Sequence, residues 1–227
     1  MTTGNNNNAS VSSKGLSTVQ TFTKRTFDIV MSFLGLAVLW PVVVIGWILA
    51  TISTGKNGLF IHERIGLNGR PFPMFKLRSM KEVEGVTTSN TAGNDVRITR
   101  TGKWLRKLKI DELPQLANVL IGHMSVVGPR PDVAGYTDVL EGEDRILLTI
   151  RPGITGPASL TYRHEEEILA AAKDPEYRND HVLWPHKVTI NREYISNWSF
   201  AKDIGYIVQT VIGSPLTIAP ESFKEPS

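Results

Sequence analysis

Residues 29–52 read IVMSFLGLAVLWPVVVIGWILATI, a run of 24 residues without a charged side chain. As a helix that rises about 1.5 Å per residue, this run can cross the hydrocarbon core of a bilayer, which is about 30 Å thick. Pro41 lies near its centre, where a proline removes one backbone donor and clashes with the carbonyl four residues earlier. The fold therefore depends on whether the helix crosses the membrane or breaks at Pro41 and turns back.

Basic residues flank both ends of this run. Lys24 and Arg25 precede it, and Lys56 and Arg64 follow it. Because positively charged flanks stay on the cytoplasmic side of membranes, this placement puts both ends of the helix on one side. A helix that breaks at Pro41 and returns, called re-entrant below, satisfies that rule. Hydropathy alone leaves a kinked single-span anchor open, since membrane helices tolerate proline.

The composition predicts one folded domain between two polar tails. The chain has 227 residues, enough for a hydrophobic core beside the membrane element. Residues 1–21, which include four consecutive asparagines and lack the apolar core of a cleavable signal peptide, are predicted to be a disordered tail, and residues 214–227 form a second tail. The domain then covers residues 22–213, with the re-entrant membrane helix at residues 28–53. Cysteine is absent from the sequence, which excludes disulfides and thiolate zinc sites.

A β-hairpin is predicted after the membrane element. Residues 59–65 and 71–77 are partly apolar, and Asn68-Gly69 lies between them. Asn-Gly is a strong hairpin signal because both residues accept a positive φ. Residues 82–94 have the composition of a loop. Helices are expected at three later places: residues 133–148, 165–172 and 187–212, the last divided near Ser199.

Residues 99–110 have the pattern of a basic amphipathic helix. Their apolar side chains, which include Trp104, alternate with lysines and arginines, and residues 97–109 hold six basic residues and no acidic one. Such a helix is typical of one that lies on an anionic membrane surface. A nucleic-acid-binding patch is the alternative. The neighbouring membrane helix favours the membrane surface, so no nucleic-acid partner is expected.

The acidic pair Asp111-Glu112 follows this basic helix directly and precedes a second helical stretch that Gly122 ends. Pro114 suits a first helical turn, which places Asp111 at or next to the N-cap. There, free amides and the helix dipole stabilise a carboxylate. Acidic pairs at this position are most often caps, so the pair alone does not decide between a structural and a catalytic role.

Arginines in or near loops rich in glycine and proline suit a ligand with phosphates, because the guanidinium group binds phosphate through two parallel hydrogen bonds. The candidates are Arg64, Arg78, Arg106, Arg130 and Arg151. The sequence contains no Walker loop, no dinucleotide glycine fingerprint, no HExxH zinc motif and no Gly-x-Ser-x-Gly elbow. The common nucleotide, zinc and serine-hydrolase sites are thereby excluded.

Five ordered blocks of the sequence share their pattern with one family. They are Lys24-Arg25-Thr26-Phe27-Asp28 before the apolar run, Arg64-Ile65-Gly66 with Phe75-Lys76-Leu77-Arg78-Ser79-Met80, residues 99–115 ending in Asp111-Glu112-Leu113-Pro114-Gln115, Met124-Ser125-Val126-Val127-Gly128-Pro129-Arg130-Pro131, and Arg151-Pro152-Gly153-Ile154-Thr155-Gly156. Together they resemble the bacterial sugar transferases, the small monotopic phosphoglycosyl transferases that act on polyprenyl phosphate. The match covers about residues 22–213.

The resemblance implies an α+β, mainly helical membrane protein. Its parts would be a proline-broken re-entrant N-terminal helix, a β-hairpin and interfacial amphipathic helices on the cytoplasmic face of a bacterial inner membrane. The implied reaction transfers a sugar-1-phosphate from a nucleotide-diphosphate sugar, expected to be a UDP-sugar, to polyprenyl phosphate. It needs Mg²⁺ and starts the assembly of a glycan such as exopolysaccharide or O-antigen. The oligomeric state stays open, with a homodimer as one option.

The resemblance also implies a role for each of five residues. Asp111 would be the nucleophile that attacks the β-phosphorus and carries a covalent sugar-phosphoryl group. Asp111 and Glu112 would hold the Mg²⁺ ion, with Glu112 also orienting the nucleophile. Arg78, Arg106 and Arg130 would bind phosphate groups.

Two other functions are compatible with the same sequence. One is a non-catalytic membrane scaffold of the same fold, against which the intact Asp111-Glu112 pair counts. The other is a membrane-associated hydrolase of nucleotide sugars, which would use the same site with water as acceptor.

The chain departs from the family pattern at Trp40, where many members have serine before the proline. It departs again at residues 157–163, PASLTYR, a change that can shift the preference for sugar or nucleotide.

Overall fold

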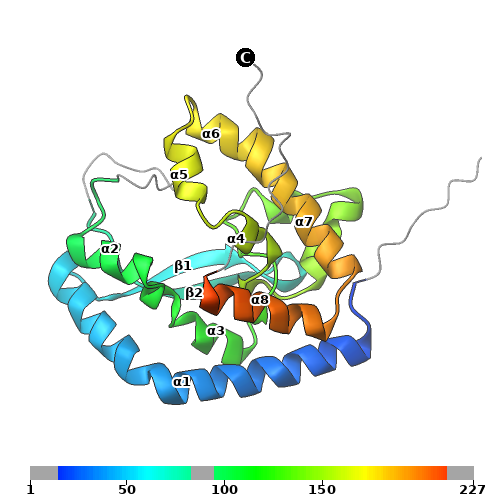
Figure 1. The fold of residues 1–227 in the computed structure, drawn as a ribbon, viewed down its shortest axis with the longest axis horizontal. Coiled ribbons are helices and arrows are strands. Elements are labelled where there is room, and N and C mark those ends of the chain that lie inside the picture. The colour runs from blue at the N-terminus through cyan, green and yellow to red at the C-terminus, as the bar shows by residue number, and fades with distance from the viewer. Residues whose placement is uncertain (1–14, 83–94, 214–227) are drawn as a thin grey trace, which may run out of the picture.

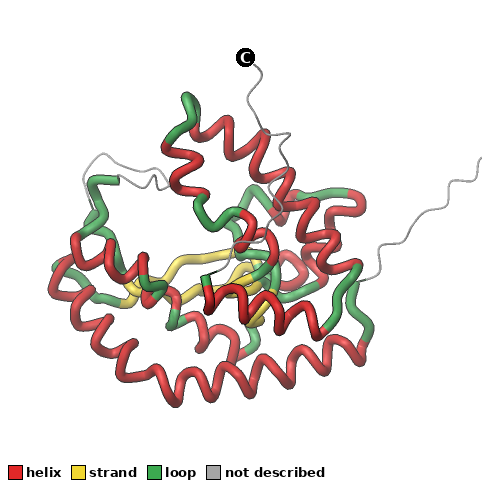
Figure 2. Tube along the Cα trace, viewed as in Figure 1, coloured by secondary structure: helices red, strands yellow, loops and turns green. Residues whose placement is uncertain are grey.

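The computed structural model describes residues 15–82 and 95–213 of the chain. Within these two ranges the chain forms eight α-helices and four short strands (Figure 1). Helices make up the outside of the molecule and the strands lie among them (Figure 2). The predicted mainly helical α+β class is therefore confirmed. The predicted loop residues 83–94, the C-terminal tail and residues 1–14 of the N-terminal tail lie outside the described residues.

The first half of the chain supplies the long helix, the hairpin and two short helices. In chain order these are α1 (Thr18–Thr54), β1 (Leu59–Ile65), β2 (Pro71–Leu77), α2 (Arg100–Lys107) and α3 (Gln115–Ile121). The second half begins with β3 (Ser125–Val127) and β4 (Gly153–Thr155). It continues with α4 (Pro157–Thr161), α5 (Glu165–Ala170), α6 (Pro175–Arg178), α7 (Trp184–Ser196) and α8 (Phe200–Ile212).

Helix α1 continues through Pro41, so the break predicted there is wrong. Figure 1 shows α1 as a bent helix with the rest of the protein on the inner side of the bend. Proline is the usual cause of such a bend, because its ring disturbs the preceding turn without ending the helix. The helix also begins earlier than predicted, at Thr18. A capping box of Ser17 and Gln20 starts it there, so residues 18–21 belong to the helix and not to the tail.

Charged side chains fasten the first half of α1 to the domain. Lys24 forms a buried ion pair with Asp203 of α8. Arg25 donates hydrogen bonds to two backbone carbonyls at the C-terminal end of α3, at 2.6 and 2.8 Å. Asp28 accepts one from the amide of Val126 in β3, at 2.9 Å. The charges that precede the apolar run are therefore structural links.

The second half of α1 packs against the same domain. Ala50 is fully buried and forms a small core with Leu77 of β2 and Leu105 of α2. Gly46 permits this contact, since a Cβ there would lie 2.6 Å from a methyl group of Leu77. Both halves of α1 thus contact the same domain.

The apolar surface of α1 is largely exposed. Among the described residues, α1 is the one helix long and apolar enough to cross a membrane, and only 11% of its most apolar 18-residue stretch is buried. The large exposed side chains include Phe33, Leu34, Val38, Trp40, Ile45 and Ile52. An apolar surface of this extent is typical of a segment that lies in lipid.

The hairpin occupies the residues predicted for it. β1 and β2 pair antiparallel, with Leu59 opposite Leu77 and Ile65 opposite Pro71. Asn68 and Gly69 adopt φ of 58° and 72°, the left-handed conformation that this dipeptide tolerates. The inner face of β2 packs on α3, so the hairpin and α3 form one unit.

Strands β3 and β4 form a parallel pair, which no short sequence pattern predicts. Val127 lies opposite Thr155. The approach is so close that a Cβ on Gly153 would lie 2.1 Å from the amide nitrogen of Gly128, and only glycine allows it. Gly153 also donates a hydrogen bond to the carbonyl of Pro129 at 2.7 Å. The strand pairing and this hydrogen bond together hold the loop that contains Arg130 in place.

The two C-terminal helices lie close to where the sequence predicts them, whereas residues 133–148 do not form the helix predicted for them. α7 and α8 separate near Ser199, as predicted, and Ser199 forms the N-cap of α8. The helix expected over residues 133–148 is wrong, because this segment holds the 3₁₀ turns Thr137–Val139 and Gly142–Thr149. Gly135 and Gly142 adopt positive φ of 95° and 57°, which a continuous α-helix excludes.

Candidate active site

Asp111 and Glu112 lie in a buried 3₁₀ turn, Ile110–Glu112, between α2 and α3. Lys109 adopts a left-handed φ of 57° and so turns the chain out of α2. Asp111 is 4% exposed and Glu112 8%. The N-cap of α3 is Pro114, so the predicted N-cap position of Asp111 is wrong. Asp111 belongs instead to the separate 3₁₀ turn, which has its own hydrogen bonds and precedes that helix.

Lys76 lies between the two carboxylates. Its Nζ is 3.5 Å from Oδ2 of Asp111 and 3.4 Å from Oε1 of Glu112. β2 presents this lysine to the 3₁₀ turn. Lys76 lies within one of the family blocks, but the resemblance implies no role for it. Its position one residue before the end of β2 does not by itself predict a functional role.

Arg130 completes this cluster from the Pro-Arg-Pro loop. Its Nη2 donates a hydrogen bond to Oε1 of Glu112 at 2.6 Å. Burial alone would raise the pKa of Glu112, but the charges of Arg130, Lys76 and Lys109 outweigh burial and hold that pKa well below its usual range. The charge of Glu112 in turn raises the pKa of Arg130. The Arg130 side chain stays 46% exposed, so a ligand can approach it.

One carboxylate oxygen of Asp111 has no hydrogen-bond partner among the described residues. Its Oδ1 is buried and accepts no hydrogen bond from any residue that the structure describes. A buried acceptor without a partner is costly, and it points to a ligand, a cation or an electrophile at this position. We call Asp111, Glu112, Lys76 and Arg130 the dyad cluster.

The dyad cluster fits Mg²⁺ in its donor chemistry. Mg²⁺ prefers oxygen ligands and is usually held by one or two carboxylates, with phosphate groups of a substrate and water completing its coordination. Asp111 and Glu112 supply two adjacent carboxylates, one with the unpartnered Oδ1. Among the described residues no group of three or more His, Cys, Asp or Glu could hold a metal by itself. A metal here would therefore need the substrate's own oxygens.

Two predicted phosphate-binding arginines lie elsewhere. Arg78 donates from Nε to the carbonyl of Asn57 at 2.9 Å, and its guanidinium lies over the ring of Phe60. Arg106 of α2 forms an ion pair with Glu166 of α5. In the described part of the chain neither arginine has a hydrogen bond or ion pair with the dyad cluster. Of the three, the structure brings only Arg130 to the carboxylates.

Arg151, a further candidate, has a structural role. Its Nε donates to the carbonyl of Gly122 at 2.8 Å, just after the end of α3. Arg25 donates to the last carbonyls of the same helix. The two arginines thus satisfy the carbonyls that a helix end leaves open, where a positive charge is also favoured by the helix dipole.

Asp132 follows the Pro-Arg-Pro loop and carries an unusual pKa. Burial raises the pKa of Asp132 to about 6, although the Thr137 hydroxyl and the charges of Lys187 and Arg64 oppose the shift. Oγ1 of Thr137 donates to its Oδ2 at 2.5 Å. The sequence alone does not identify this residue, since its burial depends on the tertiary fold.

Residues 157–163, PASLTYR, which differ from the family pattern, form α4 and the start of the turn before α5. Tyr162 at its end hydrogen-bonds through its hydroxyl to Nδ1 of His186 at 2.5 Å, and the Lys187 ammonium lies over its ring. Burial raises the pKa of Tyr162 to about 12. Lys187 also pairs with Glu165 at 2.5 Å. Whether this group affects the preference for sugar or nucleotide stays a prediction.

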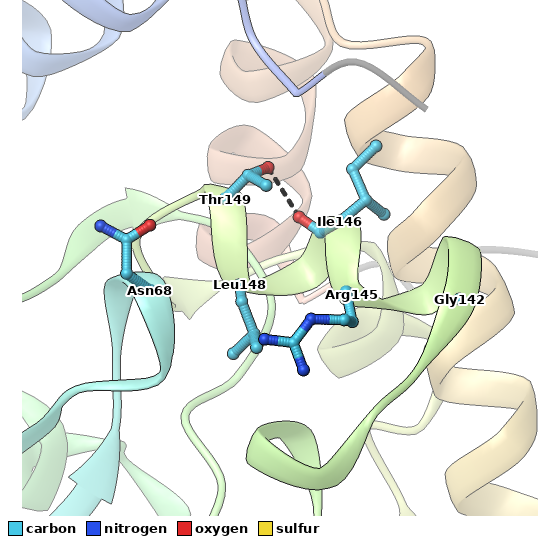
Figure 3. A pocket seen from close by; sticks show the side chains of 6 residues that line it. All are labelled: Asn68, Gly142, Arg145, Ile146, Leu148 and Thr149. Carbon is cyan, nitrogen blue, oxygen red and sulfur yellow. Dashed lines mark hydrogen bonds between the residues drawn. The ribbon is translucent and has the colours of Figure 1, made fainter. Parts of the chain in front are cut away.

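A cavity of about 370 Å³ lies between the hairpin turn and the 3₁₀ turn Gly142–Thr149. Figure 3 shows its lining, with Asn68 on one side and Arg145, Leu148 and Thr149 on the other. None of its lining residues belongs to the dyad cluster. The cavity therefore does not mark the candidate active site.

Comparison with known proteins identifies the family of the chain. The sequence model of the bacterial sugar transferases matches residues 19–214 of the chain. The uncharacterised sugar transferase EpsL of Bacillus subtilis strain 168 is 32% identical over 188 residues, which span 83% of this chain and 85% of that protein. The exopolysaccharide production protein ExoY of Sinorhizobium fredii is 31% identical over 204 residues, spanning 83% of each chain.

A third relative is a longer protein. UDP-glucose:undecaprenyl-phosphate glucose-1-phosphate transferase of Escherichia coli strain K12 is 36% identical over 203 residues, which span 86% of this chain and 41% of that protein. The match of the family model over nearly the whole described chain decides the class. The chain belongs to the bacterial sugar transferase family, which confirms the resemblance found in the sequence.

Proposed function

We propose that this protein transfers a sugar-1-phosphate from a nucleotide-diphosphate sugar, a UDP-sugar, to polyprenyl phosphate. The reaction would start the assembly of a glycan of the exopolysaccharide or O-antigen kind. The named activity of the Escherichia coli relative and the named process of the Sinorhizobium relative support this proposal. The single observation that carries it is the dyad cluster, in which two buried carboxylates face a lysine and a partly exposed arginine.

Asp111 is the proposed nucleophile. Its buried carboxylate has one oxygen next to Lys76 and one without a partner. A carboxylate is a weak nucleophile that gains from fixed geometry and from cations that neutralise the phosphates it approaches. Oδ1 attacks the β-phosphorus, the nucleoside monophosphate leaves, and a sugar-phosphoryl group stays on Asp111. Polyprenyl phosphate then takes that group and restores the carboxylate.

Glu112, Lys76 and Arg130 have supporting tasks in this proposal. Arg130 holds Glu112 and presents its exposed side to the donor's phosphates, and Lys76 balances the charge of both carboxylates. Mg²⁺ would be held by Asp111 and Glu112 and would neutralise charge on the diphosphate when bound.

The membrane attachment that we propose is re-entrant through a bend without a break: α1 enters the membrane and returns, so that both of its ends lie on the cytoplasmic face of a bacterial inner membrane. Both ends of α1 contact one domain, which a helix that crosses the bilayer between two compartments cannot do. Exposed apolar residues of α2, of its C-cap and of α8, such as Trp104, Leu108 and Val211, add to the exposed surface of α1. Helices with such faces lie at the membrane surface, where the phosphate of a polyprenyl carrier is found.

The reaction can be tested with purified enzyme and a panel of nucleotide sugars. With donor alone, we expect a burst of nucleoside monophosphate of at most one equivalent, and an adduct that mass spectrometry assigns to Asp111. Asp111→Asn keeps the shape but removes the anion, so the burst and the adduct should disappear while the fold remains. Continuous release without polyprenyl phosphate would identify a hydrolase, and no release with any donor would favour the scaffold. An adduct on another residue would contradict the assignment of the nucleophile.

A further inference from the structure

Gln115 is a buried polar residue beside the dyad cluster to which the proposed mechanism gives no task. It is 2% exposed, and its amide nitrogen Nε2 has no hydrogen-bond partner in the part of the chain that the structure describes. A buried donor without a partner is unfavourable, because it has lost its bonds to water and gained none in exchange. A residue that keeps such a donor is therefore one for which a ligand can supply the acceptor.

The backbone places Gln115 on the same face as the two carboxylates. It follows Glu112 by three residues and Asp111 by four, and the two residues in between have helical backbone angles. On a helical backbone, residues three and four apart are neighbours on one face. Gln115 thus starts α3 directly behind the carboxylates.

Asn118 shows where this face of α3 points. Its Nδ2 donates to the carbonyl of Pro73 at 2.7 Å, and its Oδ1 accepts from the amide of Phe75 at 2.9 Å, so it holds α3 against β2. The next residue of β2 is Lys76, which contacts both carboxylates. Gln115 therefore lies between the attachment of α3 to β2 and the dyad cluster.

Two buried atoms without partners thus lie within one helical turn: Oδ1 of Asp111, an acceptor, and Nε2 of Gln115, a donor. A metal ion could satisfy the carboxylate oxygen but not an N–H donor, which needs an acceptor. A phosphoryl group has both parts, an electrophilic phosphorus and negatively charged oxygens. We propose that Gln115 is a catalytic residue that donates a hydrogen bond to a non-bridging oxygen of the phosphoryl group that Asp111 attacks.

This inference rests on the proposed function. In the step concerned, a bond forms between Oδ1 of Asp111 and the β-phosphorus. The bond from that phosphorus to the oxygen bridging to the α-phosphate breaks, and its electron pair leaves with the nucleoside monophosphate. No proton moves to or from Gln115. Its hydrogen bond strengthens as negative charge grows on the non-bridging oxygen, which is how a fixed donor lowers a barrier.

The test is Gln115→Met, which keeps the length of the side chain and removes the donor. We expect the maximal rate of nucleoside monophosphate release in the first turnover to fall about ten- to a hundredfold, with the half-saturating donor concentration changed less than about threefold. The melting temperature of the donor-free enzyme should stay the same or rise, because an unpaired buried donor is replaced by an apolar group. Gln115→Glu, which puts a negative charge beside the phosphoryl oxygens, should be at least as slow and serves as a second variant.

Asn118→Leu is the matched control on the same face of α3. Asn118 is also buried, but both ends of its amide are paired, so its loss should lower the melting temperature. A fall in melting temperature for Gln115→Met like that of the control would make Gln115 a structural residue and overturn the inference. A first-turnover rate equal to that of the active parent enzyme would overturn it as well. If the parent enzyme forms no adduct with any donor, the proposed function fails together with this inference, and that result differs from the other two.

Discussion

Lys24 of α1 and Asp203 of α8 form an ion pair inside the protein, with 2.5 Å between Nζ and Oδ2. Tyr194 donates to Oδ1 of the same aspartate at 2.7 Å, and Trp198 donates to Oδ2 at 3.1 Å. Both carboxylate oxygens of Asp203 therefore accept hydrogen bonds. The pair joins the start of the membrane helix to the last described helix of the domain, and it sets how α1 leaves the domain.

Removing Lys24 alone should destabilise the protein strongly. Lys24→Met leaves the Asp203 carboxylate buried without its cation, which typically costs about 3–5 kcal/mol. Lys24→Met combined with Asp203→Asn removes both charges, so the double variant should be less destabilised than the sum of the single variants. Denaturation in detergent measures these values. Lys56→Met is the control, because its ion pair with Glu82 is exposed and should contribute little to stability.

The two ends of α1 should be on the cytoplasmic side. Cysteines replacing Thr18 and Lys56, at exposed positions in a chain without cysteine, can be probed with an impermeant thiol reagent from outside intact cells. We expect neither to be labelled until the cells are opened. Labelling of one end only would show a spanning helix and refute the re-entrant arrangement. Pro41→Ala should straighten α1, shift molecules toward spanning and reduce activity.

Local sequence signals predicted the parts of the fold that depend on neighbouring residues. The Asn68-Gly69 turn fixed the hairpin, and Ser199 fixed the boundary between α7 and α8. The capping box that starts α1 at Thr18 is a local signal of the same kind, formed by Ser17 and Gln20. In residues 133–148, apolar spacing suggested a helix, but two glycines with positive φ produced 3₁₀ turns.

Contacts between distant segments could not be predicted in this way. The parallel pair β3–β4 joins residues about 28 positions apart, as in Ser125 opposite Gly153, and no short pattern records it. The same holds for the site. Sequence blocks suggested Asp111, Glu112 and Arg130, but the place of Lys76 between the carboxylates depends on how β2 packs beside the 3₁₀ turn. Arg78 and Arg106 contact other groups instead. The sequence could not predict this, because it does not show which residues are neighbours in space.

Arg130 should matter more to catalysis than Arg106. Arg130→Lys loses the two parallel donors of the guanidinium, so we expect kcat to fall about ten- to a hundredfold. Arg106→Lys can keep its ion pair with Glu166, and a contact with a lipid headgroup would also tolerate lysine, so its activity should change by less than about threefold. Steady-state kinetics with the native donor compares them. Full activity of Arg130→Lys would rule out its role as a phosphate clamp.

Glu112 can be separated from the arginines by its dependence on magnesium. Glu112→Gln replaces a carboxylate with a neutral amide, a poorer ligand for a hard cation, so the Mg²⁺ concentration for half-maximal rate should rise about tenfold or more. Titration of Mg²⁺ after treatment with a chelator measures this value. Arg130→Ala is the comparison, for which we expect a lower rate and an almost unchanged Mg²⁺ requirement. Equal Mg²⁺ curves for Glu112→Gln and the parent enzyme would remove Glu112 from the metal site.

Asp132 should make stability depend on pH in a direction opposite to that of most carboxylates. Its ordinary pKa of 3.8 is raised to about 6 by burial, so the folded protein holds a proton that the unfolded chain has released. The stabilisation from this proton is complete below about pH 3.8 and is lost as the pH rises through 6. Above that pH the buried charge is a cost.

Asp132→Asn removes this cost and keeps an oxygen for the hydroxyl of Thr137. We therefore expect the melting temperature at pH 8 to rise by roughly 2–5 °C, and the gain to shrink toward zero at pH 5, where the parent carboxyl is already protonated. Thermal scans of both proteins across this range give the difference at each pH. Glu141→Gln, at an exposed position, is the control and should show no such trend. A gain for Asp132→Asn that is equal at both pH values, or larger at pH 5, would mean that the carboxyl is not protonated in the folded protein near pH 6.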